Sequence, residues 1–179
     1  MTDKVATPEP WLRGPLPGIP SLLQPAAHAL VMAREDVTAA LDGISGDQLW
    51  LTPAGMTPLG FHVAHLAGST DRLLTYARNE ALSDAQKEAL ALERHITDVR
   101  PSLAQMLAGW HQTVDAALRQ LASTPEQHLL EPRFVGRARL PSTVLGLLFH
   151  AAEHASRHTG QVVTTAKLLR GRGLPPPPG

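Results

Sequence analysis

Hydrophobic positions along the chain recur at intervals of three and four residues, which is the spacing of one face of an α-helix. Four long segments follow this pattern, and residues that typically start or stop helices bound them. Thr57 followed by Pro58 predicts the start of the second segment, Ser142 predicts the cap of the last, and Gly43 and Gly171 end the first and the last. The predicted helices cover about residues 25–42, 58–79, 101–122 and 142–170.

Each predicted helix carries an apolar stripe that is expected to face a common core. Four amphipathic helices in a chain of 179 residues are typical of an all-α four-helix bundle. The stripes include Leu30 and Val37 in the first helix, Val63 and Leu66 in the second, Trp110 and Val114 in the third, and Leu147 and Ala155 in the fourth.

Shorter elements and two proline-rich ends complete the predicted organisation. Ser83 begins a short helix over about 83–95, and the stretch "RFVGRARL" predicts a small hairpin around Gly136, before the last helix. Residues 1–20 form a proline-rich lead, which Trp11 is expected to anchor. The predicted bundle then spans 21–171, and a flexible proline-rich tail follows at 172–179.

Composition narrows the chemistry available to the chain. There is no cysteine, so disulfides, thiolate ligands and a cysteine nucleophile are excluded, and any metal must be held mainly by His, Asp or Glu. Lys and Arg number 16, as do Asp and Glu, so nothing indicates binding to nucleic acid or to an anionic membrane. No signal peptide or transmembrane segment is visible, and a cytoplasmic location is expected. Histidine is abundant, with nine residues.

Three of these histidines follow one another at intervals of four in the stretch "FHAAEHASRHTGQ". His150, His154 and His158 therefore stack along one side of the predicted helix, and the last two lie on or beside its buried face. Helical zinc sites use the same spacing for a pair of ligands. Such pairs also arise by chance on long helices. One alternative is therefore a helical protein-interaction module whose histidines have no role in metal binding.

The second helix adds His62 and His65 in "FHVAHLAG", three residues apart and followed by the small Ala67 and Gly68. Small residues allow another helix to approach closely. A third imidazole from this facing helix would complete a set of three histidine ligands, and three ligands with an open position describe a catalytic metal site. His150 and one histidine of the second helix would then line the pocket, with Gln161 and Asp71 within reach of its helices.

The segments "TPLGFHVAHLAGSTDRLL" and "LGLLFHAAEHASRHTGQVVTTAKLLRG" resemble the DinB-like superfamily, the DinB/YfiT-like group of metal-binding four-helix bundles, over roughly residues 21–170. By position, the resemblance implies the metal ligands His65, His154 and His158, and it leaves His62 and His150 as neighbours. It also implies a divalent ion, most often nickel or zinc, an unusual order of helices and a homodimer. Members include damage-inducible bacterial proteins, thiol S-transferases, a mycothiol-dependent isomerase and metal-dependent hydrolases.

Two classes of function follow from such a site. A divalent ion lowers the pKa of bound water, or it stabilises the thiolate of a low-molecular-weight thiol that attacks an electrophile. The chain would then be a hydrolase or a thiol transferase acting on a small molecule. The alternative is a stress-response protein or dimeric sensor that binds metal without turnover. A loop with Arg133, Arg137 and Arg139 is expected to wall the cleft and to bind an anionic thiol, while Glu153 is expected to be solvated.

Overall fold

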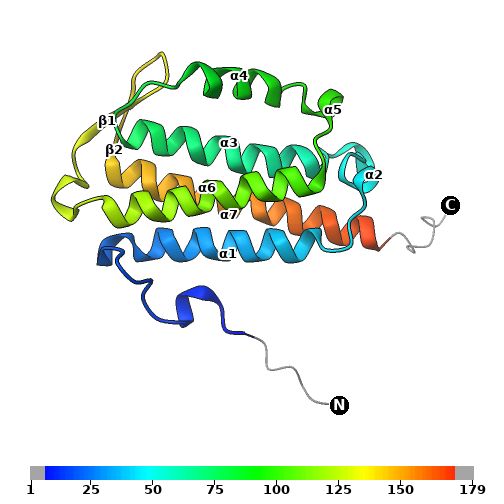
Figure 1. The fold of residues 1–179 in the computed structure, drawn as a ribbon, viewed down its shortest axis with the longest axis horizontal. Coiled ribbons are helices and arrows are strands. Elements are labelled where there is room, and N and C mark those ends of the chain that lie inside the picture. The colour runs from blue at the N-terminus through cyan, green and yellow to red at the C-terminus, as the bar shows by residue number, and fades with distance from the viewer. Residues whose placement is uncertain (1–6, 172–179) are drawn as a thin grey trace.

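Four long helices aligned along a common direction, described in a computed structural model that covers residues 7–171, make up most of the molecule (Figure 1). The amphipathic stripes predicted these helices, and the all-α four-helix bundle is confirmed. The predicted tail at 172–179 and the first six residues of the lead lie outside the described residues. The long helices are α1 (Gln24–Leu41), α3 (Leu59–Ala77), α6 (Leu103–Ser123) and α7 (Val144–Arg170).

The order of the long helices around the bundle differs from their order in the chain. Helix α7 packs against both α1 and α3, and α6 packs against the same two helices from the other side. The consecutive helices α1 and α3 are therefore diagonal to each other, as are α6 and α7. This arrangement packs α7 directly against α3, and these are the two helices that carry the histidine segments.

The core lies where the four stripes meet. Trp110 is fully buried at its centre, together with residues such as Leu30, Leu66 and Val162. Full burial of side chains of this size contributes about 1.5–3 kcal/mol each relative to exposure. No helix in the described part of the chain combines the length and the apolar character that crossing a membrane requires.

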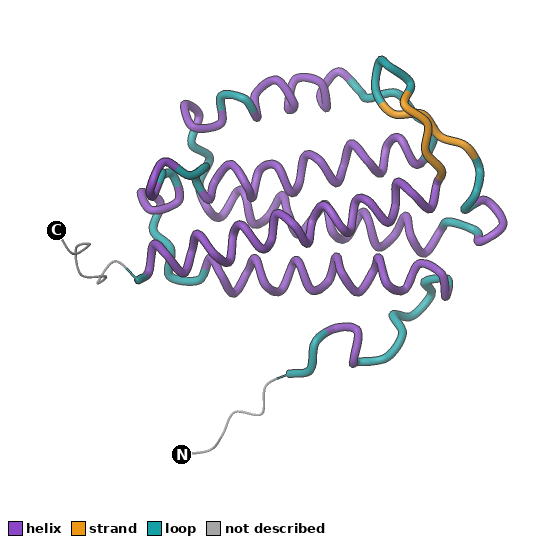
Figure 2. The backbone as a smooth tube through the Cα atoms, turned by 180° about the vertical axis from the view of Figure 1, so that it is seen from behind, coloured by secondary structure: helices purple, strands orange, loops and turns teal. Residues whose placement is uncertain are grey.

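Short elements cover one side of the bundle. Helix α4 runs alongside α3, and the two-stranded hairpin lies beside the end of α3 (Figures 1 and 2). The hairpin confirms the interpretation of "RFVGRARL", with Phe134 paired to Pro141 in antiparallel register. The short helices are α2 (Gly46–Leu49), α4 (Asp84–Glu93) and α5 (Ile96–Val99), the strands are β1 (Pro132–Val135) and β2 (Leu140–Thr143), and single 3₁₀ turns occupy Pro10–Leu12, Ser21–Leu23, Pro53–Gly55 and Glu126–His128.

Two predicted helix starts are wrong by one residue. Pro58 has an extended backbone (ψ 152°), so it precedes the second long helix, which begins at Leu59, and Thr57 does not cap it. Ser142 pairs with Arg133 in the hairpin. The cap of α7 is therefore the next residue, Thr143, whose hydroxyl oxygen accepts a hydrogen bond from the backbone N–H of Gly146 at 3.0 Å.

The lead follows the surface beside α1, but Trp11 does not anchor it. The indole is 58% exposed, and its Nε1–H donates to Glu9 within the same turn. The buried residue of this turn is Pro10. Arg13 ties the lead to the bundle instead, because its guanidinium makes a two-pronged ion pair with Glu35 of α1. The lead has no regular spacing of apolar residues, so its sequence does not indicate which side chain is buried.

Candidate metal centre

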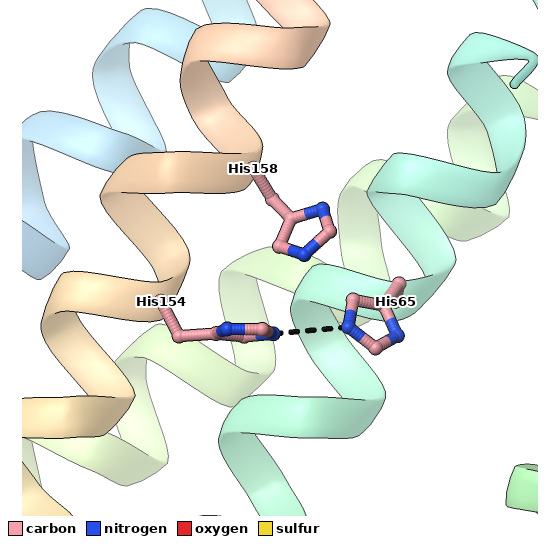
Figure 3. Close-up of side chains that lie close together, drawn as sticks. All are labelled: His65, His154 and His158. Carbon is pink, nitrogen blue, oxygen red and sulfur yellow. Dashed lines mark hydrogen bonds between the residues drawn. The ribbon is translucent and has the colours of Figure 1, made fainter. Parts of the chain in front are cut away.

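Three histidines from two helices converge on one point in the middle of the bundle (Figure 3). His154 and His158 lie one turn apart on α7, and His65 faces them from α3. Nε2 of His65 is 3.0 Å from Nε2 of His154. One ligand atom from each of the three rings lies within 4.8 Å of the other two. The structure therefore brings together the three residues that the sequence nominated.

His65 is oriented from behind by a carboxylate. Its Nδ1 contacts Oε1 of Glu93, the last residue of α4. A carboxylate only accepts hydrogen bonds, so Nδ1 carries the proton, and the lone pair of Nε2 faces His154 and His158. The ring of Phe61 stacks on His65, with 5.6 Å between centroids and 8° between planes. A hydrogen bond and a stacked ring thus hold this imidazole in the orientation of a ligand.

His158 is oriented by a second histidine of α3. Its Nδ1 lies 3.2 Å from Nδ1 of His62, which is 8% exposed. The other ring nitrogen of His158 points toward the space between His65 and His154 (Figure 3). His62 therefore flanks the cluster and contacts it through His158.

The surroundings of His62, His154 and His158 favour the neutral imidazole, which is the form that binds metal. Burial, followed by the charges of His65, His154, His62 and Arg157, lowers the pKa of His158 to about 4. Burial first, and then the charges of neighbouring cationic groups, also lowers the pKa of His154. The pKa of His62 falls because of burial and the nearby His65. At neutral pH these rings present lone pairs rather than positive charge.

Glu93 belongs to a buried ion pair that packs directly on α3. Its second carboxylate oxygen accepts a hydrogen bond from Nη1 of Arg72 at 3.1 Å, and the two side chains are 10% and 13% exposed. Burial alone would raise the pKa of Glu93, but the hydrogen bond from His65 and the charge of Arg72 outweigh burial, so the pKa is lowered. Gly68 provides the space for this pair, since a Cβ there would lie 2.7 Å from Arg72 and 2.9 Å from Glu93.

This donor set fits a divalent ion. Imidazole nitrogens bind zinc at about 2.0–2.1 Å, which places the nitrogens of one tetrahedral site about 3.3 Å apart. The separation of 3.0 Å between His65 and His154 is close to that value. The contact between His65 and Glu93 is the carboxylate–histidine pairing found behind metal-ligating imidazoles. Three nitrogens from two helices leave further coordination positions for solvent or substrate.

The remaining candidates lie around or away from the cluster. His150 is one turn before His154, half exposed, and 3.2 Å from a carboxylate oxygen of Glu153. Gln161 is exposed on α7, and no hydrogen bond joins it to the three histidines within residues 7–171. Arg137 and Arg139 line a separate pocket whose lining contains none of these histidines.

Three further charged residues considered in the sequence have partners outside the three-histidine cluster. Arg133 donates to the carbonyl of Ala77 and to Glu131, so its guanidinium is engaged outside the cluster. Asp71 accepts a hydrogen bond from Gln86. Glu153 pairs with the exposed Arg157.

Glu93 and Arg72 are the residues that sequence reasoning missed as partners of the site. Glu93 lies 28 residues from His65 on a separate helix, and a single glutamate on a short polar helix gives no local signal of such a contact. The small Gly68 indicates that another segment approaches α3 closely. The space beside Gly68 is filled by the side chains of Glu93 and Arg72.

Comparison with known families agrees with this geometry. The model of the DinB superfamily matches residues 29–162, which include all three histidines and Glu93. The chain belongs to the DinB superfamily. The resemblance drawn from the two histidine segments is thereby confirmed, and the three-histidine group of this DinB-superfamily chain is compatible with a metal-binding protein. No curated protein matches the chain.

Proposed function

We propose that this DinB-superfamily chain is a divalent-metal-dependent enzyme whose ligands are His65, His154 and His158. The observation that carries the proposal is the convergence of three imidazoles from α3 and α7. Zinc and nickel are the metals proposed, because both suit imidazole ligands. When bound, such an ion would lower the pKa of a coordinated water to near neutrality, and it would hold a coordinated thiol as the thiolate.

Among the reactions open to such a site, transfer of a low-molecular-weight thiol to an electrophile has the best support. Hydrolysis commonly uses a free carboxylate as general base beside the metal. Glu93 is the carboxylate in contact with this cluster, and both of its oxygens are occupied by His65 and Arg72. Addition of a thiolate needs no separate base once the thiol has lost its proton. Thiol transfer therefore requires no catalytic carboxylate beyond the residues of the cluster.

The chain's own residues then have distinct roles. His65, His154 and His158 hold the ion. Glu93 keeps the proton of His65 on Nδ1, and His62 orients His158 through the contact between their Nδ1 atoms. Phe61 covers one face of His65 and restricts the approach of water to that ring. The same occupied carboxylate also favours a second candidate, a metal-binding stress-response protein or dimeric sensor without turnover.

Elemental analysis of the purified protein tests the proposed ligands. Native protein is expected to retain about one equivalent of metal after desalting, and His154→Ala to lose it. His150→Ala is the matched control, since His150 lies one turn away on the same helix and is half exposed. Equal metal in the native protein and in His154→Ala would contradict the site.

A conjugation assay separates the two candidates. It combines an electrophile with several bacterial thiols and follows consumption of the thiol. An enzyme consumes thiol with multiple turnovers, and a chelator stops the reaction. Bound metal without turnover for any of the thiols would favour the sensor.

A further inference from the structure

A second hollow lies away from the histidines, between α4, the end of α3 and the hairpin. This hairpin pocket has a volume of about 860 Å³ and includes Tyr76, Leu82, Leu90 and Phe134 in its lining. Sites for small organic ligands commonly have volumes of about 300–1,000 Å³ and largely apolar walls. The hairpin pocket has the size and the wall chemistry of such a site. Figure 1 shows the hairpin beside the start of α4, and residues from both elements line the pocket.

Positive charge is concentrated around this pocket, although the chain as a whole is neutral. Arg94, Arg137 and Arg139 all line it. Within residues 7–171, no side-chain hydrogen bond or ion pair engages any of these three guanidinium groups. The one carboxylate of the lining, Glu80, is already paired with Arg78 at 2.8 Å. Three arginines thus remain free to bind an anion, and guanidinium binds carboxylate, sulfonate and phosphate groups in a two-pronged geometry.

The backbone of the hairpin loop holds one of these arginines in an unfavourable conformation. Arg139 has φ +49°, in the left-handed region that glycine or asparagine normally occupies in such turns. Its guanidinium carbon lies 4.5 Å from the centre of the Phe134 ring. The conformation places a positive charge directly beside an apolar wall of the pocket. Strained residues of this kind concentrate at ligand sites.

From the pocket, its unpaired arginines and the placement of Arg139, we infer that the hairpin pocket binds an amphipathic organic anion. The apolar body of the ligand lies against Phe134 and Leu90, and its anionic group is held by Arg137 and Arg139. This site is independent of the metal, because none of the three histidines lines it.

Two fluorescent probes test this inference on the full chain. One is 8-anilinonaphthalene-1-sulfonate, and the other is N-phenyl-1-naphthylamine, which has the same rings without the sulfonate. The sulfonate is expected to bind the native protein saturably at one site. The double variant Arg137→Ala/Arg139→Ala is expected to weaken that binding roughly tenfold or more, since it removes hydrogen bonds to a charged group. Its effect on the neutral probe should be less than about twofold.

A matched variant controls for net charge. Arg119→Ala/Lys167→Ala removes two exposed cations that lie outside the pocket lining, and it should bind the sulfonate like the native protein. Chelator-treated protein and His154→Ala should also bind it unchanged, so failure of the metal site does not affect this test. The inference is overturned if the sulfonate shows no saturable binding, if Arg137→Ala/Arg139→Ala binds it as tightly as the native protein, or if that variant weakens both probes equally.

Discussion

His65 donates its Nδ1–H to Oε1 of Glu93, and this contact joins the bundle helix α3 to the covering helix α4. Because the carboxylate fixes the proton on Nδ1, the lone pair of Nε2 faces the two histidines of α7. The second oxygen of Glu93 is held by Arg72, so the carboxylate cannot rotate without breaking a buried ion pair. Helix α4, which covers α3, therefore contributes directly to the orientation of His65 in the three-histidine cluster.

Glu93→Gln is expected to lower zinc affinity about 10–100-fold, because it removes the charge that orients His65 and strengthens it as a ligand. Competition with a chromophoric chelator measures this affinity. Glu88→Gln, an exposed position on the same helix, is the control and should leave it unchanged. Equal affinities for the two variants would show that Glu93 does not act on the ligand.

Gly68→Ala tests the space behind the same ion pair. The new methyl group would lie 2.7 Å from Nη1 of Arg72 and 2.9 Å from Oε2 of Glu93, so the ends of these two side chains must shift, and Glu93 is the residue that holds His65. Zinc affinity is expected to fall by up to about tenfold. Gly109→Ala, also within a helix but with nothing within 4 Å, should keep the native affinity and gain about 0.5–1 kcal/mol of stability. A native zinc affinity in Gly68→Ala would contradict the argument.

A second glycine, Gly60, is required for core packing rather than for the three-histidine cluster. A Cβ at Gly60 would lie 2.5 Å from the ring of Trp50, a rigid group packed against the core. Gly60→Ala is therefore expected to destabilise the protein by about 1–3 kcal/mol, as overpacking does. Urea unfolding of the metal-free protein measures the change. Stability equal to or above that of the native protein would mean that Trp50 does not pack as described.

The metal-free protein should lose stability as the pH falls from about 6.5 toward 4. In the unfolded chain His158 takes up a proton near its ordinary pKa of about 6.5, whereas in the folded chain it does so only near 4. Between these values the unfolded state binds more protons, so acid favours unfolding. Urea midpoints measured across this range in chelator should fall more steeply for the native protein than for His158→Gln. Identical pH profiles would contradict the lowered pKa of His158.

The sequence predicted the bundle because its signals are local. Apolar residues at helical spacing predict which face is buried, and the four-residue interval between His154 and His158 places both rings on one side of α7 whatever surrounds it. The place of His65 could not be predicted from local spacing, since only the packing of α3 on α7 brings His65 next to His154 and His158. That placement came from the resemblance to a family and not from spacing.

What the sequence could not predict depends on packing between distant segments. The ion pair of Arg72 with Glu93 forms because α4 folds back over α3, and no periodic pattern encodes that register. The one-residue error at the start of α7 has a similar origin. Ser142 is a competent cap by composition, but pairing within the hairpin takes that position and leaves Thr143 to cap the helix.

The most direct test of the metal centre is an anomalous difference map from crystals grown with zinc. The account predicts a single strong peak at about 2.0–2.1 Å from one nitrogen each of His65, His154 and His158. The nitrogens facing the ion should be Nε2 of His65, with Nδ1 still on Glu93, and Nε2 of His154. A map with no peak between the three rings, or with the ion bound while His65 faces away from it, would contradict the account.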